Sequence, residues 1–268
     1  MDLALSAEQR ALVDSVRSLL EKRSDSAAVR RAMASESGYD EALWATLCEQ
    51  IGVAALNIPE EYDGVGASVV ETALVLEQLG YALTPTPLLA SLVASEALLA
   101  GGDEEAKKEM LPRIAAGEVV VQPQDTLDPT FRLLPDGSPS AAALIGAAAL
   151  AVGCMQRGLD MTVAYTKQRV QFGRPIGSFQ ALKHRMADLL VLVEMSRSAS
   201  WAAARGMIAP EVAAAYCGDA VMKVAGEVVQ LHGGIAITWE HDAHLILKRA
   251  HALSTYFGHP HELRAGVV

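Results

Sequence analysis

The second half of the chain contains four long helical segments joined by short connections, and this succession restricts the folds that the chain can adopt. Ser140 is placed to cap the first segment, Pro210 opens the third, and Gly233 with Gly234 ends it. Long consecutive helices with short loops pack as antiparallel neighbours. We therefore predict an antiparallel four-helix bundle over residues 140–268, with helices at about 141–167, 179–207, 210–232 and 240–257.

The first 118 residues carry a separate set of helix signals. Ser68 with Glu71 has the spacing of a capping box, and the helix that follows is expected to end at Gly80. Other capping residues precede further runs with apolar residues at helical spacing, namely Ser6, Asp40 and Asp103. These signals predict an N-terminal helical domain over residues 1–118.

The helical pattern is interrupted between the two halves. Residues 119–139 contain four prolines, a β-prone run at Val119–Val121 and a second candidate strand within Asp128–Leu133. At about 5–6 residues per strand, the segment has room for two or three short strands at most. We expect a mainly α fold in which residues 119–139 form a vestigial β linker between the two helical domains.

Charge and composition exclude several classes of function. With 22 basic against 32 acidic residues, the formal net charge of −10 argues against a nucleic-acid-binding protein. The densest apolar stretch, Ala141–Val152, contains Gly146 and is shorter than the ~18 residues that suggest a membrane span. No basic segment opens the chain, and its three cysteines lie far apart, which predicts reduced thiols in a cytoplasmic protein.

Two motifs could carry binding chemistry. In Arg169-Val-Gln-Phe-Gly-Arg-Pro-Ile176, an arginine at a helix end precedes a turn restricted by glycine and proline. A guanidinium fork beside loop N–H groups suits a pyrophosphate, although a solvated arginine in an ordinary helix connection has the same spacing. In Gln230-Leu-His-Gly-Gly234, two glycines would let another molecule approach the backbone, although glycine also serves as a plain helix cap.

The order of these motifs resembles that of a known family. Pro59-Glu-Glu-Tyr-Asp-Gly-Val-Gly66 comes first, the Arg169 motif extends to Phe179-Gln180, and Gln230-x-x-Gly-Gly234 follows. Together they are similar to the flavin-dependent acyl-CoA dehydrogenases over almost the whole chain.

This resemblance implies that FAD is held between subunits. In the family, the two motifs reach across a subunit interface to the pyrophosphate and adenosine parts of the flavin cofactor. The matching positions here are Arg169, Gln171, Phe172, Gln230, Gly233 and Gly234.

Two parts that the resemblance leads one to expect are missing from the sequence. Residues 119–139 are too few to build the family's middle β-domain, which covers the flavin ring and helps to hold the acyl-CoA. The family's catalytic glutamate belongs at either of two positions, which are occupied here by Phe257 and Ala143. The chain therefore has no carboxylate at either base position. His241 and His244 have a spacing that a metal site could use, but acidic residues are ordinary at a helix start, and we expect no metal.

Two functional hypotheses follow. In the first, the chain pairs with a full-length acyl-CoA dehydrogenase subunit, as a heterotetramer, and contributes contacts to the shared FAD. That partner would supply the base and most of the acyl-CoA site, and the resemblance to heteromeric actinobacterial enzymes suggests a steroid side chain as substrate. In the second, the chain is a flavin-free helical homo-oligomer with a binding or scaffolding role.

Overall fold

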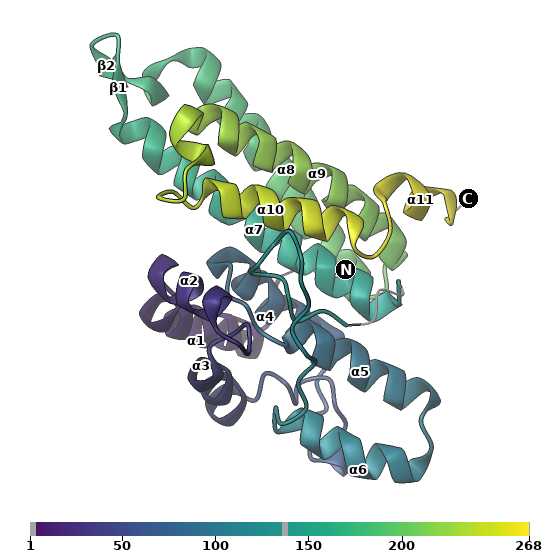
Figure 1. Cartoon of the computed structure of the whole chain (residues 1–268). Coiled ribbons are helices and arrows are strands. Elements are labelled where there is room, and N and C mark those ends of the chain that lie inside the picture. The colour runs from purple at the N-terminus through teal and green to yellow at the C-terminus, as the bar shows by residue number, and fades with distance from the viewer. Residues whose placement is uncertain (1–3, 136–138, 268) are drawn as a thin grey trace.

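The predicted bundle is present in the computed structural model, which describes residues 4–135 and 139–267. The Ser140 hydroxyl caps the first bundle helix, accepting a hydrogen bond from the Ala143 N–H at 3.2 Å. Figure 1 shows the bundle lying over a second helical layer, which is formed by the N-terminal part of the chain. The bundle consists of α7 (Ala141–Gln168), α8 (Gln180–Ala204), α9 (Pro210–His232) and α10 (Ala243–Thr255), followed by the short α11 (Pro260–Ala265).

The N-terminal layer contains the predicted helices and one that was not predicted. The capping boxes at Ser6 and Ser68 are both formed, and Asp40 and Asp103 cap their helices. The additional helix α2 begins after Asp25, whose carboxylate accepts a hydrogen bond from the Ala28 N–H at 2.7 Å. The elements of this layer are α1 (Ala7–Arg23), α2 (Ser26–Ala34), α3 (Glu41–Thr46), η1 (Leu47–Ile51), η2 (Glu60–Tyr62), α4 (Val69–Ala82), α5 (Leu88–Gly101) and α6 (Glu104–Ala115).

The glycine expected to end α4 lies inside it instead. The helix continues through Gly80 to Ala82, and Leu83 adopts the left-handed cap conformation with φ of 54°. A Cβ atom at Gly80 would lie 2.3 Å from the carbonyl oxygen of Leu150 in α7. Gly80 is therefore a close-contact residue between two helices, and its role in packing explains why it did not stop the helix.

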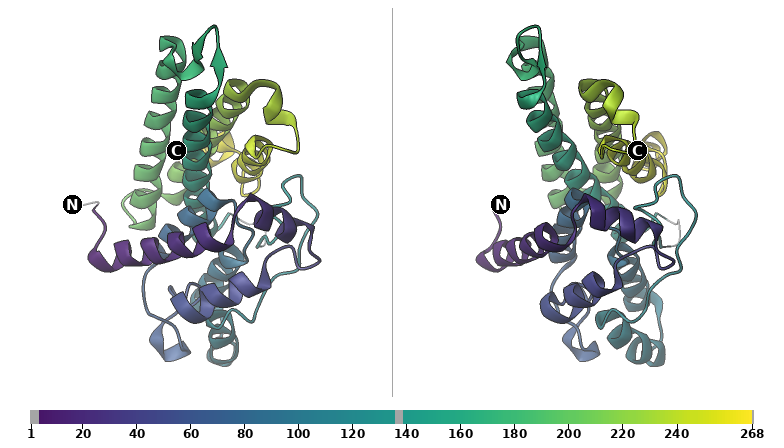
Figure 2. Two further views of the ribbon diagram at one scale, coloured as in Figure 1. Left: turned by 90° about the vertical axis from the view of Figure 1, so that its left-hand side faces the viewer. Right: turned by 60° about the vertical axis from the view of Figure 1, so that its left-hand side comes forward.

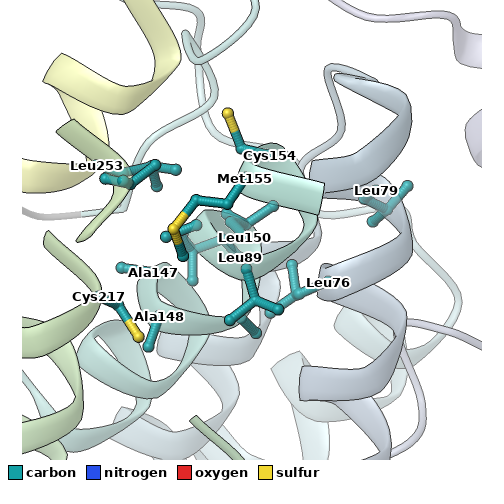
Figure 3. Close-up of a cluster of buried hydrophobic side chains, with 14 of the residues drawn as sticks. Leu76, Leu79, Leu89, Ala147, Ala148, Leu150, Cys154, Met155, Cys217 and Leu253 are labelled. Atoms are coloured by element: carbon teal, nitrogen blue, oxygen red, sulfur yellow. The ribbon is translucent and has the colours of Figure 1, made fainter. Parts of the chain in front are cut away.

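Helix α7 is the centre of the hydrophobic core. It packs against α4 on one side and against α8, α9 and α10 on the others. Figure 3 shows side chains of α4 and α5 meeting those of α7, including Leu150 and Met155, while Cys217 and Leu253 close the cluster from α9 and α10. All three cysteines are buried and free, as the sequence predicted.

Two bundle segments are markedly apolar, and burial explains the composition of the first. Ala141–Gln168 and Pro210–Ile237 are long and apolar enough to cross a membrane by length and composition alone, which is weak evidence for a span. In the first segment, 89% of the most apolar window is buried inside the protein. Its apolar surface is thus already covered by the neighbouring helices.

The segment between the two halves has an irregular conformation in its described residues. Within 119–135 and at residue 139, the chain forms no strand, which corrects the expectation of a vestigial β linker there. Phe131, Leu133 and Leu134 are instead buried between the helical layers. Asp128 is also buried, and its carboxylate lies 2.7 Å from the Arg249 guanidinium of α10. The buried apolar side chains and the Asp128–Arg249 pair therefore hold this irregular segment in place without strand pairing.

Candidate functional site at one end of the bundle

The Arg169 motif forms a β-hairpin that projects beyond the end of α7 and α8 (Figures 1 and 2). Its strands are β1 (Val170–Gln171) and β2 (Arg174–Pro175), and η3 (Ile176–Ser178) leads into α8. Phe172 and Gly173 occupy the two-residue loop with φ of 54° and 77°. Positive φ at both positions is the geometry of a type I′ turn, which suits a tight hairpin.

Phe172, at the tip of the hairpin, has an unusual backbone conformation. An aromatic residue at positive φ is uncommon and costs about 1–3 kcal/mol. Its side chain is nevertheless 90% exposed, so burial within this chain does not compensate for that cost. The ring of Phe179 supports it edge-on at 6.1 Å, and the Arg174 guanidinium lies over that second ring at 4.0 Å. The hairpin therefore presents a fixed aromatic side chain to the outside.

Arg169 lies at the base of this hairpin. Its carbonyl oxygen accepts a hydrogen bond from the Ile176 N–H at 2.8 Å, which closes the loop. The side chain is exposed, and no hydrogen bond or ion pair of its guanidinium is found within the described parts of the chain. Its five donors are thus available to a molecule bound from outside.

The second motif ends α9 at the same end of the bundle. Gln230 is exposed, and Gly233 has φ of 65°, a conformation that glycine adopts without strain. A Cβ atom added at Gly233 or Gly234 would meet no atom within 4 Å. The Gly233 N–H donates to the Val229 carbonyl oxygen, while the space beside both glycines is open to close approach. A permanently charged guanidinium, with backbone that a ligand can approach closely, suits a diphosphate.

An aromatic stack joins the two motifs. Tyr165, four residues before Arg169, stacks on His232 with 4.5 Å between ring centroids. His232 in turn lies 4.6 Å from His241 at the start of the last bundle helix. The His232 Nδ1–H donates to the Val228 carbonyl oxygen at 2.7 Å. This stack fixes the ends of α7 and α9 relative to each other.

Acid is expected to weaken this end of the bundle. Burial lowers the pKa of His232, His241 and His244 below the ordinary value of 6.5. A histidine whose folded-state pKa is depressed binds more protons when unfolded, so stability falls as pH drops below about 6.5. We expect His232→Phe, which keeps a ring on Tyr165, to reduce the loss of unfolding free energy between pH 7 and pH 5. The exposed His261→Gln is the control, and urea titrations at each pH would measure both. Equal pH slopes for His232→Phe and the wild type would contradict this prediction.

An exposed apolar patch lies beside the glycine pair, and sequence reasoning missed it. In η4 (Gly233–Ile237) and just beyond it, Ile235 is 40% exposed, Ile237 77% and Trp239 62%. The Lys248 ammonium lies over the Trp239 ring at 4.5 Å. Most of the Trp239 side chain reaches solvent. The available signal was the series of large apolar residues at alternating positions directly after the Gly-Gly helix stop.

The two positions for the family's base are closed. Ala143 is fully buried in the first turn of α7, and Phe257 is 3% exposed beneath the C-terminal segment. The cavity that Phe257 lines has a volume of only about 10 Å³, which is too small for a substrate. The acidic cluster at the start of α10 is engaged structurally, since Asp242 binds Arg30 at 2.8 Å and Ser26 at 2.7 Å from α2. Among the described residues, no group of three or more His, Cys, Asp or Glu side chains could hold a metal ion.

Comparison with known proteins agrees with the arrangement of these motifs. Residues 6–118 match the model of the acyl-CoA dehydrogenase N-terminal domain, and residues 144–264 match that of the C-terminal domain. This chain belongs to the acyl-CoA dehydrogenase family. Members of the family are generally FAD-dependent.

Two curated relatives align with nearly the full length of this acyl-CoA dehydrogenase family member. Acyl-CoA dehydrogenase IpdE2 of Mycolicibacterium smegmatis is 43% identical, with 96% of this chain and 97% of the relative covered. The IpdE2 protein of Mycobacterium tuberculosis is 42% identical, with 96% and 95% covered.

Solved structures share the fold at lower identity. A steroid ACAD variant, Tcur3481-Tcur3483, superposes with a TM-score of 0.86 at 21% identity, covering 97% of this chain and 96% of that chain. The ChsE4-ChsE5 complex from Mycobacterium tuberculosis gives 0.85 at 21%, covering 100% and 98%. Butyryl-CoA dehydrogenase from Megasphaera elsdenii gives 0.82 at 18%, covering 99% and 98%. At these identities, the likeness establishes the helical architecture of the family.

Proposed function

We propose that this chain is a half-site subunit of a heteromeric FAD-dependent acyl-CoA dehydrogenase. It binds a full-length dehydrogenase subunit and extends Arg169, Phe172, Gln230 and Gly234 toward the FAD of that partner. The single observation that carries the proposal is the hairpin tip, where Phe172 is held at positive φ and is 90% exposed. Strain of this kind persists where the conformation serves a contact, and within the described residues the edge-on ring of Phe179 leaves most of the Phe172 side chain free for one.

The donor set indicates which part of the cofactor is bound. Arg169 provides a charged fork, and the backbone at Gly233 and Gly234 is open to close approach by a ligand. These groups suit the pyrophosphate and adenosine end of the cofactor, with Gln171 and Gln230 as further polar contacts. When bound, FAD supplies the oxidant for α,β-dehydrogenation of an acyl-CoA thioester.

The proton-transfer step belongs to the partner in this proposal. General-base catalysis needs a carboxylate within hydrogen-bond reach of the substrate proton. This chain has Ala143 and Phe257 at the family's base positions, and both are buried in apolar surroundings. The partner would also hold most of the acyl-CoA, since residues 119–135 lie between the helical layers and form no sheet.

The relatives bear on the substrate and on the assembly. One structural neighbour is a steroid ACAD, and another is described as the ChsE4-ChsE5 complex. By analogy with them, we propose a steroid side-chain thioester as the substrate and a heterotetramer as the assembly. Analogy at the level of the fold suggests these assignments, and the flavin experiment below tests the site itself.

Substitution of Arg169 tests the site assignment. In a complex co-purified with a full-length acyl-CoA dehydrogenase subunit, Arg169→Ala removes a charge-assisted contact worth about 1.5–3 kcal/mol. That loss corresponds to roughly 10- to 100-fold weaker FAD binding. Arg169→Lys keeps the charge without the planar fork, so it should fall between Ala and the wild type. The measurement is flavin absorbance per complex during dilution.

A matched control separates the site from a general loss of charge. Arg113 lies on α6 in the N-terminal layer and is about half exposed. Arg113→Ala should leave flavin retention unchanged. Unchanged flavin content in Arg169→Ala would refute the site assignment. A complex that never contains flavin, with any partner dehydrogenase, would favour the flavin-free scaffolding role.

A further inference from the structure

A cavity of about 300 Å³ lies where the N-terminal helical layer meets the bundle. Residues of α1, α2 and α4 line it from the first layer, and residues of α7 and α10 line it from the second. The Arg169 hairpin and the Gly233 helix stop contribute nothing to its lining, and neither do Ala143 and Phe257. The cavity is therefore separate from the candidate flavin site and from the family's base positions.

Part of the cavity wall is apolar. Its buried aliphatic side chains come from α1, α2, the end of α4 and α10, and they are Leu20, Val29, Leu83 and Leu245. The volume is at the lower end of the range for small-molecule sites, which is about 300–1,000 Å³. A short apolar chain or a small ring system fits a space of this size, whereas a dinucleotide or a coenzyme A thioester exceeds it.

Arg157 of α7 brings a charge with unused donors into this cavity. Its guanidinium lies 5.8 Å from the centre of the Tyr81 ring and 4.0 Å from the Asp242 carboxylate, which is too long for a hydrogen bond. The Tyr81 hydroxyl, which itself donates to Asp160 at 3.1 Å, accepts from one of the guanidinium donors. Because an arginine has five donors, most of those of Arg157 have no partner among the described residues.

Arg17 of α1 is a second arginine in the lining with little engagement. Its Nε donates to the Gln78 side-chain oxygen at 3.3 Å. The carboxylate nearest to it, that of Asp14 on the same helix, lies 3.8 Å away and is 74% exposed. A pair of this kind contributes little, so the terminal donors of Arg17 are available to a ligand.

The acidic groups of the cavity are mostly engaged already. Asp242 accepts hydrogen bonds from α2, from Arg30 at 2.8 Å and from Ser26 at 2.7 Å. The Asp25 carboxylate caps the start of α2. Glu21 is exposed and has no hydrogen bond or ion pair in the described parts of the chain. The lining thus offers two arginines with spare donors against one unpaired carboxylate.

We propose that this cavity binds a small amphipathic carboxylate. The ligand's carboxylate accepts hydrogen bonds from the Arg157 fork, with Arg17 as a second positive charge, and its apolar body lies against Leu20, Val29 and Leu83. Planar bidentate pairing is the strong form of arginine–carboxylate contact, and an apolar wall beside it selects for an amphipathic molecule. A ligand of opposite charge would have Glu21 as its single unpaired counterion. The inference does not depend on flavin binding, which concerns the hairpin end of the bundle.

Isothermal titration calorimetry of the purified full-length chain with sodium decanoate tests the charge of the ligand. Decanoate should bind with one site per chain, and decylammonium, which has the same apolar body, should bind at least tenfold more weakly. Glu21→Gln removes the one unpaired carboxylate and should strengthen decanoate binding by roughly two- to fivefold. Absence of decanoate binding, or equal affinity for decylammonium, would overturn the proposal.

Substitutions in the lining test the location. Arg157→Met keeps an apolar stem beside Tyr81 and should weaken decanoate binding by about 10- to 100-fold, as expected for loss of a charge-assisted contact. Ala82→Leu adds bulk inside the cavity and should abolish binding. Arg31→Met is the matched control, because Arg31 is exposed on α2 and does not line the cavity, and it should leave the affinity unchanged.

Circular dichroism would establish that each variant keeps its helices. A folded Ala82→Leu variant that still binds decanoate would place the ligand elsewhere on the protein and overturn the assignment. Unchanged affinity in Arg157→Met would overturn it as well.

Discussion

Replacing Gly153 with alanine is expected to destabilise the protein by about 3 kcal/mol or more, at the upper end of the range for overpacked cores. Gly153 lies where α7 crosses α4, and an added Cβ would lie 1.9 Å from the Glu77 carbonyl oxygen and 2.5 Å from the Tyr81 nitrogen. These neighbours are backbone atoms of a helix, so no rotamer change can make room. The helices would have to separate, and the packing around Leu150 and Met155 would open with them.

A second glycine in a bundle helix provides the control. Gly226 is exposed in the interior of α9, and a Cβ atom there would meet nothing within 4 Å. Gly226→Ala should therefore stabilise the protein by up to about 1 kcal/mol, since alanine is the better helix former. Urea unfolding of the two variants would show changes of opposite sign. A Gly153→Ala variant as stable as the wild type would mean that α4 and α7 are not in backbone contact.

A third glycine, Gly80, shows what the sequence could and could not predict about the fold. Capping residues act locally, so Ser68, Asp103 and Ser140 correctly marked where helices begin. Gly80 was interpreted as a helix end because glycine commonly has that role. Its actual role depends on Leu150, seventy residues away, which no local pattern reveals. The same reasoning applies to residues 119–135, where β-prone composition suggested strands but burial against two helical layers decided the conformation.

The candidate site was also predicted only in part from the sequence. The turn after Arg169 and the Gly233 helix stop were both identified from motifs, because turns and caps have residue requirements that can be recognised, whereas the strand pairing of the hairpin was not predicted. The exposed patch of Ile237 and Trp239 was missed, since exposure of an apolar side chain is a property of the assembled surface. The Tyr165–His232 stack was missed for a related reason, as it joins helix ends 67 positions apart.

Loss of the Arg249 side chain is expected to cost about 3–5 kcal/mol, as is usual when one member of a buried ion pair is removed. Arg249 is 1% exposed on α10, and its guanidinium lies 2.7 Å from the Asp128 carboxylate, which is fully buried. It also donates to the carbonyl oxygen of Thr130 at 2.7 Å. Arg249→Met keeps much of the side-chain volume but leaves the carboxylate of the connecting segment unpaired and away from water.

The Asp128–Arg249 pair holds the connecting segment against the bundle, so its loss should lower the free energy of unfolding of the whole protein. A double-mutant cycle with Asp128→Asn separates the interaction from packing, because Asp128→Asn/Arg249→Met leaves neither charge unpaired. We expect the double variant to be clearly more stable than the sum of the two single losses predicts. Arg113→Met, which removes an exposed pair with Glu118 at 3.7 Å, should cost no more than about 1 kcal/mol. Simple additivity in the cycle would show that Asp128 and Arg249 contribute to stability separately and not through their ion pair.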